Sequence, residues 1–390
     1  MDRVRPGIEV LTENPHPWVR NARLGLLCNP ASVTAALRHS REVIRERFPG
    51  QLRVLFSPQH GFFAEKQDNM VESDHIDDPV TGLPVYSLYG ESRCPTHEMF
   101  ENLDVLLVDL QDVGTRVYTF IYTLSYCLET ARSTGRRVLV LDRPNPVGGV
   151  HLEGSLLEAE WASFVGRYPI PMRHGLTIGE ISLLFNRAFG IGAELDVVPM
   201  SGWQRFMMFR DTGLPWVAPS PNLPTPESAM VYPGQVIWEG TNLSEGRGTA
   251  QPFELFGAPY LDTGGVEREI AGLILEGGVL RPCVFEPTSG KHAGKACNGF
   301  QMHVTSPDRF RPFTAALRLL QAIIRLHPGA FEWKAPPYEY EFERLPIDLI
   351  LGGDSLRRRI EAMEPVESIE RSWKSPLERF RSMSRKYQLY

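Results

Sequence analysis

The chain has 390 residues, of which 42% are apolar and 23% charged, and its formal net charge at pH 7 is −6. This composition is typical of a soluble globular protein with roughly two or three domains, and the acidic balance argues against nucleic acid as a partner. The five cysteines are scattered and form no CxxC pair, so we expect free thiols rather than disulfides or a zinc site. The N-terminal stretch lacks the apolar segment of a signal peptide, and no window of about 18 apolar residues predicts a membrane span. Together these features predict a cytoplasmic protein.

Short apolar runs alternate with helical patterns through the first half of the chain. Strands are expected in RLGLLCNP (23–30), LRVLFS (52–57), LPVYSL (83–88), LDVLLVDL (103–110), RRVLVLDRPNP (136–146, with its exit loop) and ELDVVPM (194–200). Helices are expected at 33–48, from about Tyr118 to Ser133, and from near Thr177 to Gly190. This alternation predicts βαβ units and a Rossmann-like, mostly parallel α/β sheet domain over residues 1–212.

The composition changes beyond residue 212. Residues 213–234 contain six prolines with little periodicity, which predicts an ordered but irregular connector. Strands with turns at 277–306, an amphipathic helix at 310–328, and a strand or short helix followed by a helix at 346–365 come next. We therefore expect a smaller α+β auxiliary domain over residues 235–390.

Three polar loops, SPQHGF, DLQDVGTR and LDRPNPVGG, each leave the carboxyl end of a predicted strand. Ligands of parallel sheets bind at this edge, so the loops are expected to gather at one rim. The first loop offers His60, Glu65, Lys66, Asp68 and Glu72. If it is not simply a solvated surface loop, Phe62 and Phe63 form an apolar wall that raises the pKa of a neighbouring carboxyl.

The other two loops have structural and functional interpretations. Asp112 is either a helix cap or a catalytic acid, and Arg116 either pairs with an acid or receives a ligand carboxylate. Asp142 and Arg143 either pair to fix their loop or bind a ligand together with Asn145.

His174 stands just before a predicted capping box, in which Thr177 is the N-cap and Glu180 its partner. A lone histidine in this position is either structural or part of a site. Further along, VIWEGTNLSEGRGTAQPFE is dense in polar side chains between glycines, and a mere turn rarely needs so many. Its candidate ligand-binding residues are Glu239, Asn242, Glu245, Arg247 and Glu254.

Several motifs are missing. The chain has no GxGxxG and no GxxxxGK[ST] for nucleotides, no GxSxG elbow and no HExxH. Carboxylates, arginines, asparagines and aromatic side chains remain, and this inventory suits a glycosidase with paired carboxyl groups.

Ten motifs in order resemble the DUF1343 family, whose characterised members are exo-β-N-acetylmuramidases of the NamZ type. They are GLLCNP, SPQHGF, LPVYSLYG, DLQDVGTRVYTF, LDRPNPVGG, EGSLLE, SFVGRYPIPMRHGLTIGE, PSPNLPT, YPG and EGTNLSEGRGT, and they span about Gly25 to Pro259. The resemblance implies a Rossmann-like domain, an auxiliary domain and an active-site cleft between them. It also implies release of N-acetylmuramic acid from the non-reducing end of peptidoglycan fragments, without a metal or nucleotide cofactor.

The resemblance suggests partners for this substrate. An arginine is expected to bind the lactyl carboxylate, and the acetamido and hydroxyl groups call for amide and acidic side chains. The candidate substrate-binding residues are Arg116, Asp142, Arg143, Asn145, His174, Asn222, Glu239, Asn242 and Arg247.

One position departs from the family. Many relatives have Pro-Glu-His-Gly where this chain has Pro58, Gln59, His60 and Gly61, so the expected catalytic carboxyl is missing. In one hypothesis Glu65 takes over proton transfer. In a second, Gln59 positions the acetamido group, and the acid comes from Glu65, Asp112, Glu239 or Glu245. In a third, the protein binds sugars without turnover. The candidate catalytic residues are Glu65, Gln59, His60, Asp112 and Glu245.

Two other classes of function are weighed against the hydrolase. A non-catalytic sugar-binding protein would use the same polar loops. A nucleotide-dependent enzyme on a Rossmann-like sheet is disfavoured because no phosphate-binding loop is found.

Overall fold

The computed structural model describes residues 3–66, 70–90, 92–271 and 275–390. Its largest sheet has seven strands in the order β3-β4-β2-β1-β5-β6-β9, and every neighbouring pair is parallel except β3 with β4. The strands are β1 (Leu24–Cys28), β2 (Leu52–Ser57), β3 (Ile76–Asp77), β4 (Pro84–Ser87), β5 (Val105–Asp109), β6 (Arg137–Leu141) and β9 (Glu194–Val198). The predicted Rossmann-like α/β sheet is confirmed.

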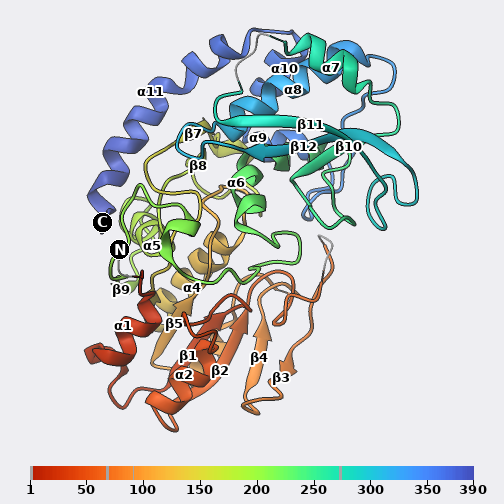
Figure 1. Ribbon diagram of the computed structural model, residues 1–390. Coiled ribbons are helices and arrows are strands. Elements are labelled where there is room, and N and C mark those ends of the chain that lie inside the picture. The colour runs from red at the N-terminus through yellow and green to blue at the C-terminus, as the bar shows by residue number, and fades with distance from the viewer. Residues whose placement is uncertain (1–2, 67–69, 91, 272–274) are drawn as a thin grey trace.

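Helices cover both faces of this sheet (Figure 1). On one face, α1 (Gly7–Glu13) and α2 (Ser40–Arg47) contribute Ile8, Leu11 and Ile44 to a core with the side chains of β1 and β2. On the other face, α4 (Phe120–Thr134) and α5 (Ile178–Arg187) pack in the larger core. Strands β1 and β5 are buried at every residue, as strands of a sheet covered on both faces must be.

Local signals explain where the helices begin and end. The helix predicted at 33–48 begins only at Ser40, because Val33 and His39 pair in an antiparallel bridge and Leu37 adopts a positive φ of 60°. The prediction was wrong for residues 33–39. Helix α4 ends at Gly135, whose φ of 65° is the left-handed C-cap conformation. Thr177 and Glu180 form the predicted capping box of α5.

The C-terminal part contains an antiparallel sheet of order β10-β12-β11 and a group of helices. Its elements are β10 (Leu255–Ala258), β11 (Gly278–Phe285), β12 (Cys297–Val304), α7 (Thr263–Glu269), α8 (Pro312–Leu326), α9 (Pro346–Leu351), α10 (Asp354–Glu361) and α11 (Val366–Ser384). The α+β character is therefore confirmed. The proline-rich connector is only partly irregular, because α6 (Pro226–Gln235) begins within it. Pro226 occupies the first turn of α6, where its missing N–H costs no hydrogen bond. Shorter elements are α3 (His97–Glu101), β7 (Glu153–Leu156) and β8 (Pro171–Arg173).

Helix α11 leads the chain back to the N-terminal region, so that the two marked ends lie close together (Figure 1). Val4, Met200 and Trp203 form a small apolar cluster there, against which Tyr390 packs. All five cysteines are free thiols, as expected. Within the described ranges, no helix is long and apolar enough to cross a membrane.

Candidate active site

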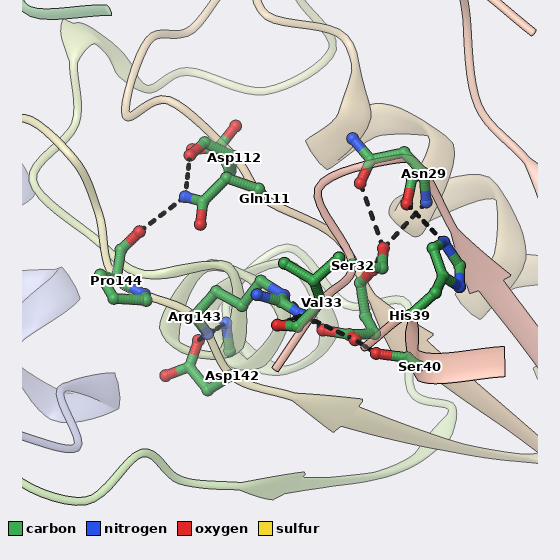
Figure 2. Close-up of polar contacts among 12 residues, drawn as sticks. Asn29, Ser32, Val33, His39, Ser40, Gln111, Asp112, Asp142, Arg143 and Pro144 are labelled. Carbon is green, nitrogen blue, oxygen red and sulfur yellow. Dashed lines mark hydrogen bonds and ion pairs between the residues drawn. The ribbon is translucent and has the colours of Figure 1, made fainter. Parts of the chain in front are cut away.

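The rim of the sheet carries a polar cluster at the carboxyl ends of β1, β5 and β6 (Figure 2). The guanidinium of Arg143 forms a buried ion pair with Asp109, in which Nη2 lies 2.9 Å from Oδ2, and it also donates to the carbonyl of Val33. Ser40 donates to the same carboxylate. Arg143 therefore pairs with Asp109 rather than with Asp142, and its donors serve the fold.

Asp142 directly follows β6, is buried, and binds the start of α5. Its Oδ1 accepts hydrogen bonds from the backbone of Gly179 (2.7 Å) and Arg143 (3.0 Å). Its Oδ2 accepts from the hydroxyls of Thr177 (2.7 Å) and Tyr390 (2.8 Å). Burial, with a contribution from Glu180, raises the pKa of Asp142 to about 7. These bonds tie together the sheet, α5 and the C-terminal residue.

Three further rim candidates also bond within the protein. Asp112 does not cap α4, whose N-cap is Thr119. It accepts from the backbone of Gly114 (2.7 Å), and its Oδ2 lies 3.4 Å from Nε2 of the fully buried His174. Nδ1 of His174 accepts from the backbone of Leu176 at 3.2 Å. Asn145 bonds the carbonyl of Leu176 and the N–H of Val147.

Arg116 is fully buried and joins the sheet region to the C-terminal helices. Its two terminal nitrogens donate to the carbonyls of Ser155 (2.7 Å), Ile170 (3.2 Å) and Ile350 (2.8 Å). Burial lowers the pKa of this guanidinium to about 10. Arg116 therefore holds backbone carbonyls and is not placed to receive a ligand carboxylate.

The crevice beside the cluster is closed. Successive strands are added to one side of β1 as far as β4 and then to its other side from β5 onward. The point between β1 and β5 is the topological switch point, where ligands of open α/β sheets usually bind. Here Phe209 and residues 214–217 cover that position, and the hollow that Arg143 and Gln111 help to line leaves about 10 Å³ for water-sized molecules. This space is far too small for a nucleotide.

A second hollow lies between the sheet region and the C-terminal part, and five predicted site residues meet there. Those five are Gln59, His60, Asn222, Glu239 and Arg247, and the other polar wall residues include Thr119, Ser220, Tyr232, Tyr338 and Glu339. We call this hollow the seam pocket. It offers about 30 Å³ to water-sized molecules and adjoins a wider cavity of about 380 Å³. The two share Glu239, Arg247 and Tyr338.

An ion-paired carboxylate stands where the two hollows meet. Glu239 accepts from Nη2 of Arg247 (2.6 Å) through one oxygen and from the hydroxyl of Tyr338 (2.6 Å) through the other. Arg247 also lies 3.3 Å from Glu245, which in turn pairs with Lys291 at 2.8 Å. Burial raises the pKa of Glu245, but Lys291 and Arg247 outweigh it, and the pKa is lowered overall. Glu245 therefore remains charged and orients Arg247, a poor arrangement for a proton donor.

Asn242, from the same polar segment, lies away from the seam pocket. Its side chain donates to the carbonyl of Ala330 (2.8 Å) and accepts from the hydroxyl of Tyr260 (2.7 Å). Glu254 accepts from the hydroxyl of Thr225 at 2.9 Å. Both residues brace the chain rather than face a ligand.

His60 presents an acceptor to the seam pocket. Its Nδ1 lies 2.8 Å from the carbonyl of Lys66, which only accepts, so Nδ1 carries the proton and Nε2 has a lone pair. Burial lowers the pKa of His60 to about 4. The imidazole is therefore neutral near pH 7 and suits hydroxyl recognition better than acid catalysis.

Gln59 is held between two partners in the wall of the seam pocket. Its Oε1 accepts from the hydroxyl of Thr119 (2.6 Å), and its Nε2 donates to Glu339 (3.0 Å). Glu339 also accepts from the hydroxyl of Tyr89 at 2.7 Å. Glu339 is not predicted from the sequence, because YEYEFE shows no recognisable motif and Glu339 is 280 positions away from Gln59.

Glu65 has a different environment from the one expected. Its carboxylate folds back on its own loop, where Oε2 accepts from the backbone of Phe63 (3.2 Å), and its side chain is exposed. Phe62 packs in the core, whereas Phe63 is exposed. The expected apolar wall does not enclose Glu65, and Glu65 is not among the residues that line the seam pocket. Glu72 accepts from the hydroxyl of Tyr340 (3.2 Å), and Asp68 lies outside the described residues.

Comparisons with known proteins agree along the whole chain. Residues 24–227 match a family model described as the N-terminal part of the exo-β-N-acetylmuramidase NamZ, and residues 230–390 match the C-terminal part. The chain is 44% identical, over 388 residues, to the peptidoglycan β-N-acetylmuramidase NamZ of Bacillus subtilis strain 168, covering 100% of this chain and 92% of the relative.

Two solved structures of DUF1343 family proteins from Bacteroides fragilis NCTC 9343 share the fold. One has a TM-score of 0.88 at 32% identity, and the other a TM-score of 0.78 at 27% identity. Each alignment covers 100% of this chain and 99% of the other. Because the two family models together match nearly the whole sequence, this chain belongs to the NamZ family of exo-β-N-acetylmuramidases.

Proposed function

We propose that this chain is a glycoside hydrolase that releases N-acetylmuramic acid from the non-reducing end of peptidoglycan fragments. Family membership along the full chain carries this proposal. The seam pocket supports it with two carboxyl side chains, Glu239 and Glu339, in one buried polar wall. Paired carboxyl groups are the usual equipment for glycosidic bond hydrolysis.

The cavity beside the seam pocket suits the lactyl side chain of N-acetylmuramic acid. Its carboxylate is free in the sugar without peptide. Lys334 and Lys291 line the cavity. The pKa of Lys291 is lowered by burial and also by the positive charge of the nearby Lys334. Lys291 forms an ion pair with Glu245 and donates hydrogen bonds to two backbone carbonyls. Lys334 is exposed and forms no ion pair within the described chain. Lys334 is therefore the cation that we assign to a substrate carboxylate.

The test compares substrates with and without this acidic group. The purified protein is incubated with a chromogenic N-acetylmuramide, with a disaccharide that has N-acetylmuramic acid at its non-reducing end, and with the matching N-acetylglucosaminide. We expect release from the first two and little from the third. Lack of release from both muramides, under conditions in which a characterised relative is active, would remove the hydrolase proposal. Lys334→Met should raise KM for the muramides only.

A second candidate function, muropeptide binding without turnover, is favoured by Gln59. The family resemblance implies a glutamate at this position, and an amide cannot supply a proton as a carboxylic acid does. Calorimetric binding of N-acetylmuramic acid by a protein that cleaves neither muramide would select this function. We also propose a cytoplasmic location, which the five free thiols favour, and cell fractionation would test it.

A further inference from the structure

The turn that carries Glu339 has an unusual backbone. Tyr338 and Glu341 exchange backbone hydrogen bonds of 2.9 and 3.0 Å, and the two residues between them, Glu339 and Tyr340, have positive φ angles of 47° and 66°. Two consecutive left-handed residues define a type I′ turn, which normally contains glycine, asparagine or aspartate. Neither position here holds such a residue, so the turn stores strain of the kind that clusters at functional sites.

The strained turn places the carboxyl of Glu339 in the wall of the seam pocket. The residue is only 5% exposed. Tyr89 and Gln59 each donate a hydrogen bond to the carboxyl, one to each oxygen. Because Thr119 donates to the carbonyl oxygen of Gln59, the amide nitrogen is turned toward Glu339. The side chain at position 59 therefore positions a carboxyl that comes from the far end of the chain.

We propose that Glu339 is the general acid of this enzyme and supplies the carboxyl that Gln59 lacks, an inference that rests on the proposed function. The carboxyl of Glu339 gives its proton to the glycosidic oxygen as the bond from that oxygen to the anomeric carbon breaks, and the bonding electrons stay on the leaving oxygen. Water bonds to the anomeric carbon and loses a proton to the carboxylate of Glu239. Exchange with solvent then restores a protonated Glu339 and an ionised Glu239.

The surroundings of the two carboxyls match these roles. Burial raises the pKa of Glu339, and the negative charge of Glu239 adds to this rise, although the hydrogen bonds from Tyr89 and Gln59 and the charge of Arg247 oppose it. Glu239 is instead ion-paired with Arg247. A buried carboxyl beside an ion-paired one is an arrangement that separates an acid from a base.

The test uses the leaving group to separate acid catalysis from structure. Glu339→Gln is assayed on the muramic acid disaccharide, whose leaving alcohol needs a proton, and on a dinitrophenyl N-acetylmuramide, whose leaving phenolate does not. We expect kcat on the disaccharide to fall roughly 10²–10⁴-fold, the usual contribution of acid catalysis, while the aryl substrate loses less than about tenfold. The alkaline limb of the pH profile, where the acid loses its proton, should disappear in the variant.

Glu341→Gln is the matched control, because Glu341 lies in the same turn and its side chain accepts from the backbone of Glu343 and Arg344. It should retain activity on both substrates within about twofold. Thermal unfolding and calorimetric binding of N-acetylmuramic acid check that Glu339→Gln keeps its fold and its pocket. If it does not fold, Glu339→Asp serves instead, with the same substrate contrast expected in weaker form.

The outcomes separate this inference from the proposed function. Equal losses on the two substrates by a folded variant, or an unchanged alkaline limb, would overturn the role of Glu339 while leaving the hydrolase intact. A wild-type protein inert toward both substrates would overturn the hydrolase and the general acid together.

Discussion

The polar cluster at the sheet rim and the seam pocket are built from similar side chains, but those side chains are bonded differently. At the rim, Arg143 donates hydrogen bonds to Asp109 and to a backbone carbonyl, and Asp142 accepts four hydrogen bonds. In the seam pocket, Glu239 and Glu339 are also bonded, but they line a hollow that shares Glu239, Arg247 and Tyr338 with a wider cavity. A dense polar sequence therefore does not identify a site. Open space beside polar side chains is what singles out the seam pocket as the candidate site.

The largest effect is expected from neutralising Glu239. Glu239→Gln keeps the size of the side chain but leaves the water without an ionised acceptor. We expect kcat on the disaccharide to fall roughly 10²–10⁴-fold. Calorimetric binding of N-acetylmuramic acid should change far less. A variant that retains most of its kcat would show that Glu239 only orients Arg247.

At the rim, the loss should appear in stability instead of turnover. Arg143→Met leaves Asp109 as a buried carboxylate without its cation, which typically costs about 3–5 kcal/mol of unfolding free energy. Denaturant unfolding measures this cost, and kcat per folded molecule should stay near that of the wild type. The double variant with Asp109→Asn should recover part of the loss. If Arg143→Met is instead as stable as the wild type but inactive, this arginine belongs to the active site.

The pH profile offers a finer contrast. Tyr89 donates to Glu339, and this bond lowers the pKa of the carboxyl. In Tyr89→Phe the pKa should rise, so Glu339 stays protonated to higher pH and the alkaline limb of kcat moves up. A hydrogen bond to a charged group is worth about 1.5–3 kcal/mol, so the limb should shift by about one to two pH units. A shift toward lower pH would contradict the assignment.

The smallest effect is expected at Glu65. Because its exposed carboxylate folds onto its own loop, Glu65→Gln should change kcat less than about twofold. A loss of more than about tenfold on the disaccharide would instead return Glu65 to the position of general acid, as the sequence suggested.

The sequence was informative wherever the physics is local. Alternating apolar runs predicted the parallel sheet, and the capping box at Thr177 and Glu180 predicted the start of α5. The polar density of residues 236–254 placed Glu239 and Arg247 among the candidates, and the family resemblance added Gln59. The structure brings these three into one pocket. For Asp142, Arg143 and Asn145 the polar pattern was just as strong. It could not show that their donors and acceptors are bonded to other side chains and to backbone within the fold.

Glu339 could not be found from the sequence for another reason. Its proposed role depends on a contact with Gln59 across 280 positions and on a left-handed turn without glycine. Neither leaves a periodic or compositional signal. Glu65 looked attractive because it is close in sequence to Gln59, whereas closeness in space belongs to a residue near the other end of the chain.

The 280-residue separation of Gln59 and Glu339 also bears on how the protein regains activity after denaturation. The sheet can form from contacts within the first half of the chain, but the seam pocket is complete only when the C-terminal turn docks against it. In refolding experiments, the circular dichroism signal of the sheet should therefore recover before turnover does. A protein that has recovered its dichroism signal but cleaves nothing would be one in which the hydrogen bond between Gln59 and Glu339 has not yet formed.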